Sequence, residues 1–468
     1  MNKTTIKKLL TVSLLSFAVT AVAQNPSLSK KDLETAAALR DEALKSSKGY
    51  EIVESLTTEV GPRMAGTEGD AAAVKWGVAK LKELGFDKVW TEPVTFPTWK
   101  RGVETAEVLS PYPQPLVITA LGFSVGTPAE GLTAEIMAFD NLQALIDAPE
   151  GIAKGKIVFI KHRMHKAKDG SGYGPAVSAR GRGAVEAAKK GAVGILIRSI
   201  GTDSHRMAHT GMMRYDEEIP RIPAAALSSP DADLLENMLK RKKPVVVKVN
   251  LGARDGEQYT SHNVIGEITG SEKPDEYVII GGHLDSWDLG TGALDDGAGI
   301  AITTAAAELI ARLPKRPKRS IRVIMFANEE QGLVGARAYA EAHKDEVHKI
   351  ITGAESDFGA GPIWRIDSRV KQEAIPVVEQ MAKLMEPLGI TYGNNRAGGG
   401  PDLIPLRAAG ISVFSLRQDG TDYFDYHHTP DDTLDKVNKE HLDQNTAAYV
   451  VFAYISAQME GDFGTNLE

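Results

Sequence analysis

The sequence predicts an α/β protein built on a doubly wound sheet. From about Arg254 to the end of the chain, apolar strand-like segments alternate with helix-like segments, which is the order typical of this fold class. The runs EYVIIGGH and SIRVIMFAN indicate buried strands, and the Ala-rich run from Asp295 to Leu313 indicates a helix between them. Residues 113–253 alternate strand and helix by themselves, so we expect them to form a separate module.

The remaining elements are predicted in the same way. Residues 30–84 are rich in Ala, Leu, Glu and Lys and predict helices, which the turn GPRMAGTEGD interrupts. In the middle module, GKIVFIKHR and GAVGILIRS predict strands, and helices are expected at 183–190 and 230–239. The run ISVFSL predicts another strand, and residues 441–459 predict a long final helix. The expected division is therefore 24–112 and 254–468 for one main domain, with 113–253 as an insert.

The first 23 residues predict a secretory signal peptide. Three lysines precede an apolar stretch that begins at Leu9 and ends in the small-residue pattern Ala-Val-Ala at Ala23. The stretch is shorter than the roughly 20 residues that a membrane-spanning helix needs. We therefore expect cleavage near Ala23 and export to the periplasm or the extracellular medium.

Composition excludes several classes of partner and site. The formal net charge is −8, and removing the three lysines of the signal peptide makes the chain more acidic still. Nucleic acids and anionic membranes attract basic surfaces, so we expect neither as a partner. The chain has no cysteine, which excludes disulfides and thiolate metal sites. Any metal ion must therefore be bound by His, Asp and Glu side chains.

Candidate metal ligands of these types lie in the last part of the chain, each shortly after an apolar run. They are His283, Asp295, Glu330, Asp357 and His428. Ligands of doubly wound sheets bind beyond the carboxyl ends of the strands, so we expect all of these residues at one rim. Imidazoles and carboxylates together suit a pair of zinc ions.

The pattern also predicts hydrolytic chemistry. The three carboxylates and one metal-bridging hydroxide neutralise the charge of two divalent ions, and metal binding lowers the pKa of the bridging water to near 7. Glu329, directly beside Glu330, is the predicted general base that takes up the proton. Asp285 is two residues from His283 and is predicted to accept the second ring N–H of that histidine.

Each of these residues has a simpler interpretation when it is taken alone. The pair Asp295-Asp296 before GAGIAIT is a common helix N-cap. The adjacent Glu329 and Glu330 suit the start of a helix, where they complement its dipole. His428 and the histidine before it suit an exposed surface. Taken together, the positions favour the metal centre.

These motifs resemble the aminopeptidase-like family of dizinc exopeptidases. VIIGGHLDSWD, GALDDGAGI, ANEEQGLVGARAYA and HHTPDDT follow the order and spacing of its carboxypeptidase Q branch, and GPRMAGTEGD resembles its N-terminal segment. The resemblance covers nearly the whole chain after the signal peptide. It implies a three-layer, mixed-sheet zinc exopeptidase domain with an inserted protease-associated domain over the active site.

The resemblance also implies a role for each residue. Two Zn²⁺ per chain are expected, with Asp295 bridging them, Glu329 as the general base and Asp285 as the partner of His283. A homodimer acting on short peptides, dipeptides in particular, is implied as well. Where some relatives have a tyrosine that stabilises the oxyanion, this chain has the loop GGGPD at 398–402, so metal and backbone N–H groups are expected to do so.

Other activities remain open at this point. An aminopeptidase has the same metal centre and needs carboxylates for the α-amine of its substrate, for which Asp402, Asp419 or Asp422 are available. A carboxypeptidase needs a cation, for which Arg396 or Arg417 are available. A single-zinc glutaminyl cyclase and a non-catalytic binding protein share the fold class. The choice of a carboxypeptidase therefore rests on the resemblance.

The insert also carries histidines and methionines close together in the sequence. The histidines are His162, His165, His205 and His209. Soft ligands alone do not make a copper site. We interpret this part of the insert as a lid with some substrate contact.

Overall fold

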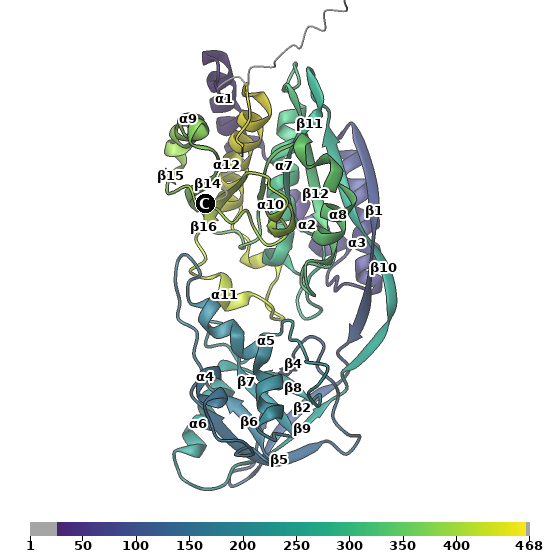
Figure 1. The fold of residues 1–468 in the computed structure, drawn as a ribbon, viewed down its shortest axis with the longest axis vertical. Helices are drawn as coiled ribbons and strands as arrows, with labels where there is room; N and C mark the ends of the chain where they lie inside the picture. The colour runs from purple at the N-terminus through teal and green to yellow at the C-terminus, as the bar shows by residue number, and fades with distance from the viewer. Residues whose placement is uncertain (1–25, 465–468) are drawn as a thin grey trace, which may run out of the picture.

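The computed structural model describes residues 26–464, which form two bodies (Figure 1). Each body contains an eight-stranded sheet, and the long strands β1 (Lys88–Lys100) and β10 (Arg254–Ile268) extend from the upper body towards the lower one. The predicted signal peptide lies outside the described residues. Among residues 26–464, no helix combines the length and the apolar character needed to cross a membrane.

The sheet of the upper body is mixed. Its strand order is β1-β10-β12-β11-β13-β16-β14-β15. Strands β12, β11, β13 and β16 run parallel at its centre, and β10 and β14 join them antiparallel. The bounds are β11 (Lys273–His283), β12 (Arg319–Phe326), β13 (Ile350–Glu355), β14 (Ile363–Arg369), β15 (Thr391–Tyr392) and β16 (Val413–Gln418).

Helices cover both faces of this sheet, which gives the three layers of the predicted fold class. The cluster on one face includes residues of α1 (Lys30–Ser46), α2 (Gly49–Glu59), α3 (Glu68–Glu83), α7 (Ala298–Ala311), α9 (Ile375–Met385) and α12 (Lys439–Gln458). The cluster on the other face includes α8 (Val334–Ala342) and α10 (Ile404–Ala408). In β11, Val278 and Ile280 belong to the first cluster, and Tyr277 and Ile279 to the second. Since successive side chains of a strand point to opposite faces, β11 is apolar on both faces over residues 277–280.

The lower body is built on the second sheet, in the order β3-β2-β9-β5-β6-β7-β8-β4. Its strands are β2 (Glu104–Ser110), β3 (Gln114–Leu116), β4 (Ile118–Ala120), β5 (Leu132–Phe139), β6 (Ile157–Ile160), β7 (Gly194–Arg198), β8 (Ala224–Leu227) and β9 (Val246–Leu251). Helices α4 (Leu142–Ile146) and α5 (Tyr173–Lys189) pack on one face, and α6 (Ser229–Leu239) on the other. Strand β2 belongs to this sheet although it precedes residue 113. We call residues 104–251 the insert.

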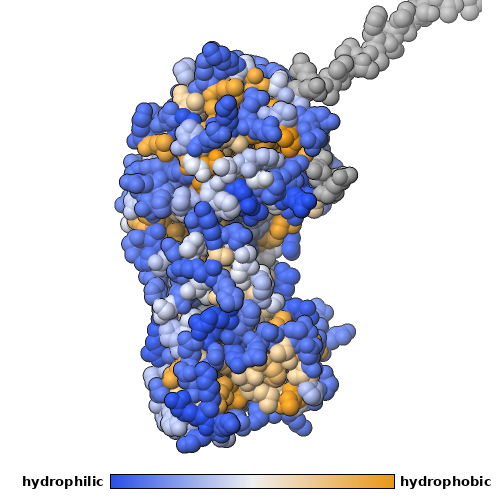
Figure 2. All heavy atoms as spheres, turned by 90° about the vertical axis from the view of Figure 1, so that its left-hand side faces the viewer, coloured by the Kyte–Doolittle hydropathy of each residue, from blue (hydrophilic) through white to orange (hydrophobic). Residues whose placement is uncertain are grey.

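The helix expected from Asp295 begins later than predicted. Helix α7 starts at Ala298, because Asp295 and Asp296 have non-helical backbone angles and lie in the connection from β11. Helix α5 begins at Tyr173, ten residues before its predicted start at 183. Both differences bring polar side chains to the junction between the two bodies. Figure 2 shows that the molecule narrows at this junction and that hydrophilic side chains cover much of its surface there.

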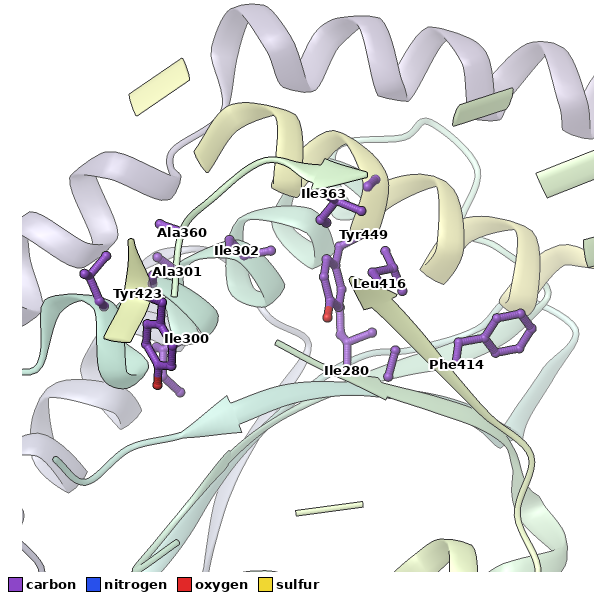
Figure 3. Packing of buried hydrophobic residues seen from close by; sticks show 14 of the residues in the cluster. Ile280, Ile300, Ala301, Ile302, Ala360, Ile363, Phe414, Leu416, Tyr423 and Tyr449 are labelled. Carbon is purple, nitrogen blue, oxygen red and sulfur yellow. The ribbon is translucent and has the colours of Figure 1, made fainter. Parts of the chain in front are cut away.

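Ile280 tests how far the core between the sheet and α7 determines stability. The side chain is fully buried among residues of α7 and α12, including Ile302 and Tyr449 (Figure 3). We expect Ile280→Ala to lower the free energy of unfolding by about 2–5 kcal/mol, because it leaves a cavity in a packed core. Urea unfolding measures the loss. The control is Val103→Ala, at a side chain that is 79% exposed, and an equal loss in both variants would contradict the assignment.

Candidate metal centre

The carboxyl ends of three adjacent parallel strands carry most of the predicted ligands. His283 is the last residue of β11, Glu330 follows β12, and Asp357 follows β13. These strands are neighbours in the order β12-β11-β13. Their carboxyl ends therefore meet at one rim of the sheet, where ligands of such sheets bind. The loop after α11 (Tyr423–Tyr426) brings His428 to the same rim.

Asp295 lies between two pairs of side chains. Its Oδ1 is 3.1 Å from Nε2 of His283, and its Oδ2 is 3.2 Å from Nε2 of His428. On the first side, Oδ1 of Asp357 is 3.7 Å from the His283 nitrogen. On the second side, Oε2 of Glu330 is 3.0 Å from the His428 nitrogen. The structure thus brings all five predicted ligands together, with Asp295 facing both pairs.

Buried charged residues hold the backbone that carries Asp295. The carboxylate of Asp432 accepts the backbone N–H groups of Leu294 at 2.6 Å and of Asp295 at 3.2 Å. The guanidinium of Arg63, which is fully buried, donates to carbonyl oxygens on both sides of the same connection. These are the carbonyls of Leu284, Thr291 and Gly292. These hydrogen bonds hold the irregular segment that carries Asp295 in one conformation.

Two further residues, Asp296 and His427, approach the site. Asp296 accepts the backbone N–H of His283 and that of Gly299, each at 3.1 Å, which is the helix-capping role considered as the simpler interpretation. The ring of His427 stacks on that of His428 with 3.5 Å between centroids, and its Nε2 is 3.6 Å from Asp295. Burial lowers the pKa of His427 well below its usual value, so this ring is neutral.

The polar atoms at the rim fit metal cations. Nδ1 of His283 lies 2.9 Å from the carbonyl oxygen of Asp285, and Nδ1 of His428 lies 3.2 Å from that of Thr210. A carbonyl oxygen accepts a hydrogen bond, so each Nδ1 carries a hydrogen and each Nε2 faces carboxylate oxygens. An imidazole nitrogen that faces a carboxylate is favourable only when a proton or a metal cation lies between the two atoms. Among the described residues, Oδ2 of Asp295 and Oε1 of Glu330 are also buried without a hydrogen-bond donor.

The electrostatics of His428 support the same conclusion. Burial lowers its pKa, but Glu330 and Asp295 outweigh burial and raise the pKa to about 9. The surrounding carboxylates therefore attract positive charge to the ring, in the form of a proton or of a metal ion at Nε2. Burial raises the pKa of Glu330 itself. The carboxylates of this rim thus require a positive counter-charge.

Asp285 and Glu329 occupy the positions expected of supporting residues, with one difference in contact. The predicted partner of the His283 ring was the carboxylate of Asp285. The carbonyl oxygen of Asp285 is nearer, at 2.9 Å from Nδ1 of His283, whereas the carboxylate Oδ1 is 3.7 Å from the same nitrogen. The carboxylate instead accepts the backbone N–H of Glu329 at 3.0 Å. Glu329 itself lines the cavity, and burial raises its pKa well above the usual value.

A cavity of about 620 Å³ lies over the rim and is lined by both bodies. The upper body contributes Glu329 and Tyr423, and the insert contributes Tyr173, Arg180 and Met212. Sequence reasoning did not identify Tyr173, Arg180 or Tyr423. It expected metal and backbone N–H groups to stabilise the oxyanion beside the loop 398–402, of which Pro401 lines the cavity. The early start of α5 is what brings Tyr173 and Arg180 to the site.

Trp287 is another residue that sequence reasoning missed. Its indole Nε1 donates to Oε2 of Glu330 at 2.6 Å, and its ring centroid lies 5.9 Å from that of His428. It belongs to the same GGHLDSWD motif as His283. Its position four residues after His283 was the feature of the sequence that could have indicated a role at the site.

Comparison with known proteins agrees with this geometry. Residues 263–453 match the family described as Peptidase family M28. Carboxypeptidase Q of Xenopus laevis is 38% identical over 88% of this chain and 86% of its own length. Aminopeptidase YwaD of Bacillus subtilis is 25% identical over 94% of this chain and 92% of its own. The crystal structure of a Peptidase M28 precursor from Shewanella amazonensis superimposes with a TM-score of 0.92 at 56% identity, covering 94% of this chain and 99% of that one.

The fold, the rim of imidazoles and carboxylates and these similarities together define a metallo-exopeptidase. The chain belongs to peptidase family M28, and the carboxypeptidase Q proteins are among its relatives. The predicted family, fold class and enzyme class are therefore confirmed.

The contact between Trp287 and Glu330 can be tested separately from the ligands. We expect Trp287→Phe to weaken metal binding by about 10-fold or more, because it removes the N–H group that orients Glu330. Competition with a chromogenic chelator measures the affinity. Trp90→Phe, which removes an indole donor to Glu92 away from the rim, is the matched control. Equal affinities in the two variants would contradict this role for Trp287.

Proposed function

We propose that this protein is a dizinc exopeptidase that removes the C-terminal residue from short peptides, dipeptides in particular. The name of its carboxypeptidase Q relatives describes the same kind of cleavage. The observation that carries the proposal is the position of Asp295 between two His–carboxylate pairs, with Glu329 beside them. A single-zinc glutaminyl cyclase would need only one such pair. Two pairs favour two ions.

The residues that would hold the zinc ions are those predicted from the sequence. His283 and Asp357 would bind one ion, His428 and Glu330 the other, and Asp295 both. Nitrogen and carboxylate oxygen are ligands that zinc prefers where no cysteine is available. When bound, the two ions supply a water of lowered pKa and polarise the scissile carbonyl group.

Glu329 is proposed to move the proton. Its neighbour Glu330 faces His428 and Trp287, whereas Glu329 lines the cavity and its side-chain carboxylate accepts no hydrogen bond from the described residues. Its carboxylate is therefore free to take a proton from the attacking water and to deliver it to the leaving amine. Asp285 orients this residue through the backbone N–H of Glu329.

Arg180 supports the choice of a carboxypeptidase. The side chain is 7% exposed and lines the cavity, and no carboxylate among residues 26–464 forms an ion pair with it. Its Nη2 donates to the hydroxyl of Tyr173 at 2.6 Å, and its Nε has no partner. A buried guanidinium with an unpaired N–H group is stabilised by an anion that binds beside it. Zinc would neutralise the metal-binding carboxylates, so the C-terminal carboxylate of a bound peptide is the anion that fits.

The residues predicted for the amine of an aminopeptidase substrate do not line this cavity. Asp422 pairs with Lys166 at 2.9 Å, and Asp419 lies 3.7 Å from Lys168. Asp402 is fully buried, with its backbone N–H bonded to Glu355. These positions favour recognition of the carboxylate end of the substrate.

Arg396 and Arg417 are the cations that the sequence suggested for that end. Arg396 is exposed, and Arg417 donates to Asp367 at 3.0 Å while lining a neighbouring cavity of about 370 Å³. Arg180 therefore replaces both in this proposal. Export after cleavage near Ala23 is part of the proposal and rests on the lysines and the apolar stretch within the first 23 residues. A protease-associated identity for residues 113–253 and a homodimer are also part of the proposal and rest on the family resemblance.

Glu329→Gln tests the mechanism. We expect kcat on a dipeptide to fall by about 100-fold to 10,000-fold with the zinc content unchanged, because the amide cannot accept the proton. A ninhydrin or mass-spectrometric product assay measures kcat, with and without prior chelation and zinc addition. Glu341→Gln, at an exposed carboxylate, is the control. A variant as fast as the parent, or a parent unaffected by chelation, would refute the proposal.

Arg180→Gln tests which end of the substrate is recognised. We expect the parent to prefer a free C-terminus over the corresponding C-terminal amide. The variant should lose about 10-fold to 100-fold in kcat/KM on the free acid, because one charge-assisted contact is removed. On the amide it should lose little. Comparable losses on both substrates, or cleavage only of peptides with a free amino end, would favour an aminopeptidase.

A further inference from the structure

The insert reaches into the metal centre through two consecutive residues. The backbone N–H of Thr210 donates to the carbonyl oxygen of His428 at 3.1 Å, and the carbonyl oxygen of Thr210 faces Nδ1 of the same histidine at 3.2 Å. His209 places its ring Nδ1 2.6 Å from the carbonyl oxygen of His427. The peptide groups on both sides of the His428 Cα are thus bonded to the insert.

His428 needs such support because of its backbone conformation. Its φ is +62°, in the left-handed region that a residue with a side chain seldom adopts. Holding a non-glycine residue there costs on the order of 1–3 kcal/mol and persists only where the surroundings fix it. A relaxed backbone at this position would turn the imidazole away from Asp295 and Glu330.

His209 is itself held rigidly inside the insert. Its Nε2 lies 2.7 Å from Oδ1 of Asp203, and both side chains are at most 1% exposed. Its backbone N–H donates to the hydroxyl of Ser199 at 2.9 Å. Gly201 lies flat against the ring, where a Cβ would come within 2.3 Å of Nε2. The Asp203 carboxylate fixes the ring so that Nδ1–H points at the His427 carbonyl.

We infer that His209 is a positioning residue of the metal centre, which acts from the insert through the His427 carbonyl to hold His428 in its ligating conformation. The inference rests on the proposed metal centre and deepens it. The insert is then a structural part of the half-site formed by His428 and Glu330. The half-site formed by His283 and Asp357 comes from the upper body alone.

Two substitutions of similar size separate this role from a general effect on folding. The amide nitrogen of asparagine takes about the place of Nδ1, and that of glutamine about the place of Nε2. His209→Asn therefore keeps the donor to His427 and loses the contact with Asp203, whereas His209→Gln does the opposite. A merely structural role for the ring predicts similar losses in both variants.

Zinc binding to the full chain tests the inference. In competition with a chromogenic chelator, we expect His209→Gln to bind one zinc ion as the parent does and the second about 10-fold to 100-fold more weakly. His209→Asn should retain most of the affinity. The visible absorption of the cobalt-loaded protein should change more in His209→Gln than in His209→Asn. Thermal unfolding of both variants reports whether the fold persists.

Thr202→Val is the matched control. It removes the 2.6 Å hydrogen bond from Thr202 to Asp425, which joins the same two segments without contacting the peptide groups at His428, so both zinc affinities should stay at the parent value. Parent-like zinc binding in His209→Gln, or equal losses of affinity in the two His209 variants, would overturn the role of His209 but not the proposed metal centre. If His428→Ala bound zinc like the parent, the proposed metal centre would fail, and the inference with it.

Discussion

The structure depends on how negative charge is compensated at one rim of the main sheet. Asp295 lies between two imidazoles, and the carboxylates of Glu330 and Asp357 complete the two sides. Buried carboxylates are unfavourable unless cations or hydrogen bonds compensate them. Arg63 is fully buried nearby, but its guanidinium bonds to backbone carbonyls instead of carboxylates. The arrangement of the rim therefore favours binding of cations that the chain itself does not supply.

Much of this rim could be predicted from the sequence because it is set by local order along the chain. His283, Glu330 and Asp357 each follow an apolar strand within a few residues, and parallel strands place such ends together. The conformation at Asp295 was not predictable in this way, because an Asp-Asp pair before a helix is typical of a helix N-cap. Asp296 does take the capping role, and the backbone geometry at the pair leaves Asp295 facing the histidines.

The residues that sequence reasoning missed share one physical feature. Arg180 lies in the insert far from His428 along the chain, yet its Nη1 is 3.4 Å from Nδ1 of that histidine. His209 likewise contacts the carbonyl oxygen of His427. Contacts of this kind form only where the two bodies meet. No periodicity or spacing within either body encodes them, so only the assembled structure places these residues.

The place of insertion explains how a second body can serve the site without disturbing the sheet. The insert leaves and re-enters the main domain at the ends of β1 and β10, which pair antiparallel along almost their whole length, with Lys100 opposite Arg254. These strands are the outer ones of the sheet, whereas the ligands follow its central strands. The upper body therefore carries the side chains of all five candidate ligands. The insert reaches the same rim through His209 and Thr210, which contact the segment that carries His428, and through Arg180, which lines the cavity.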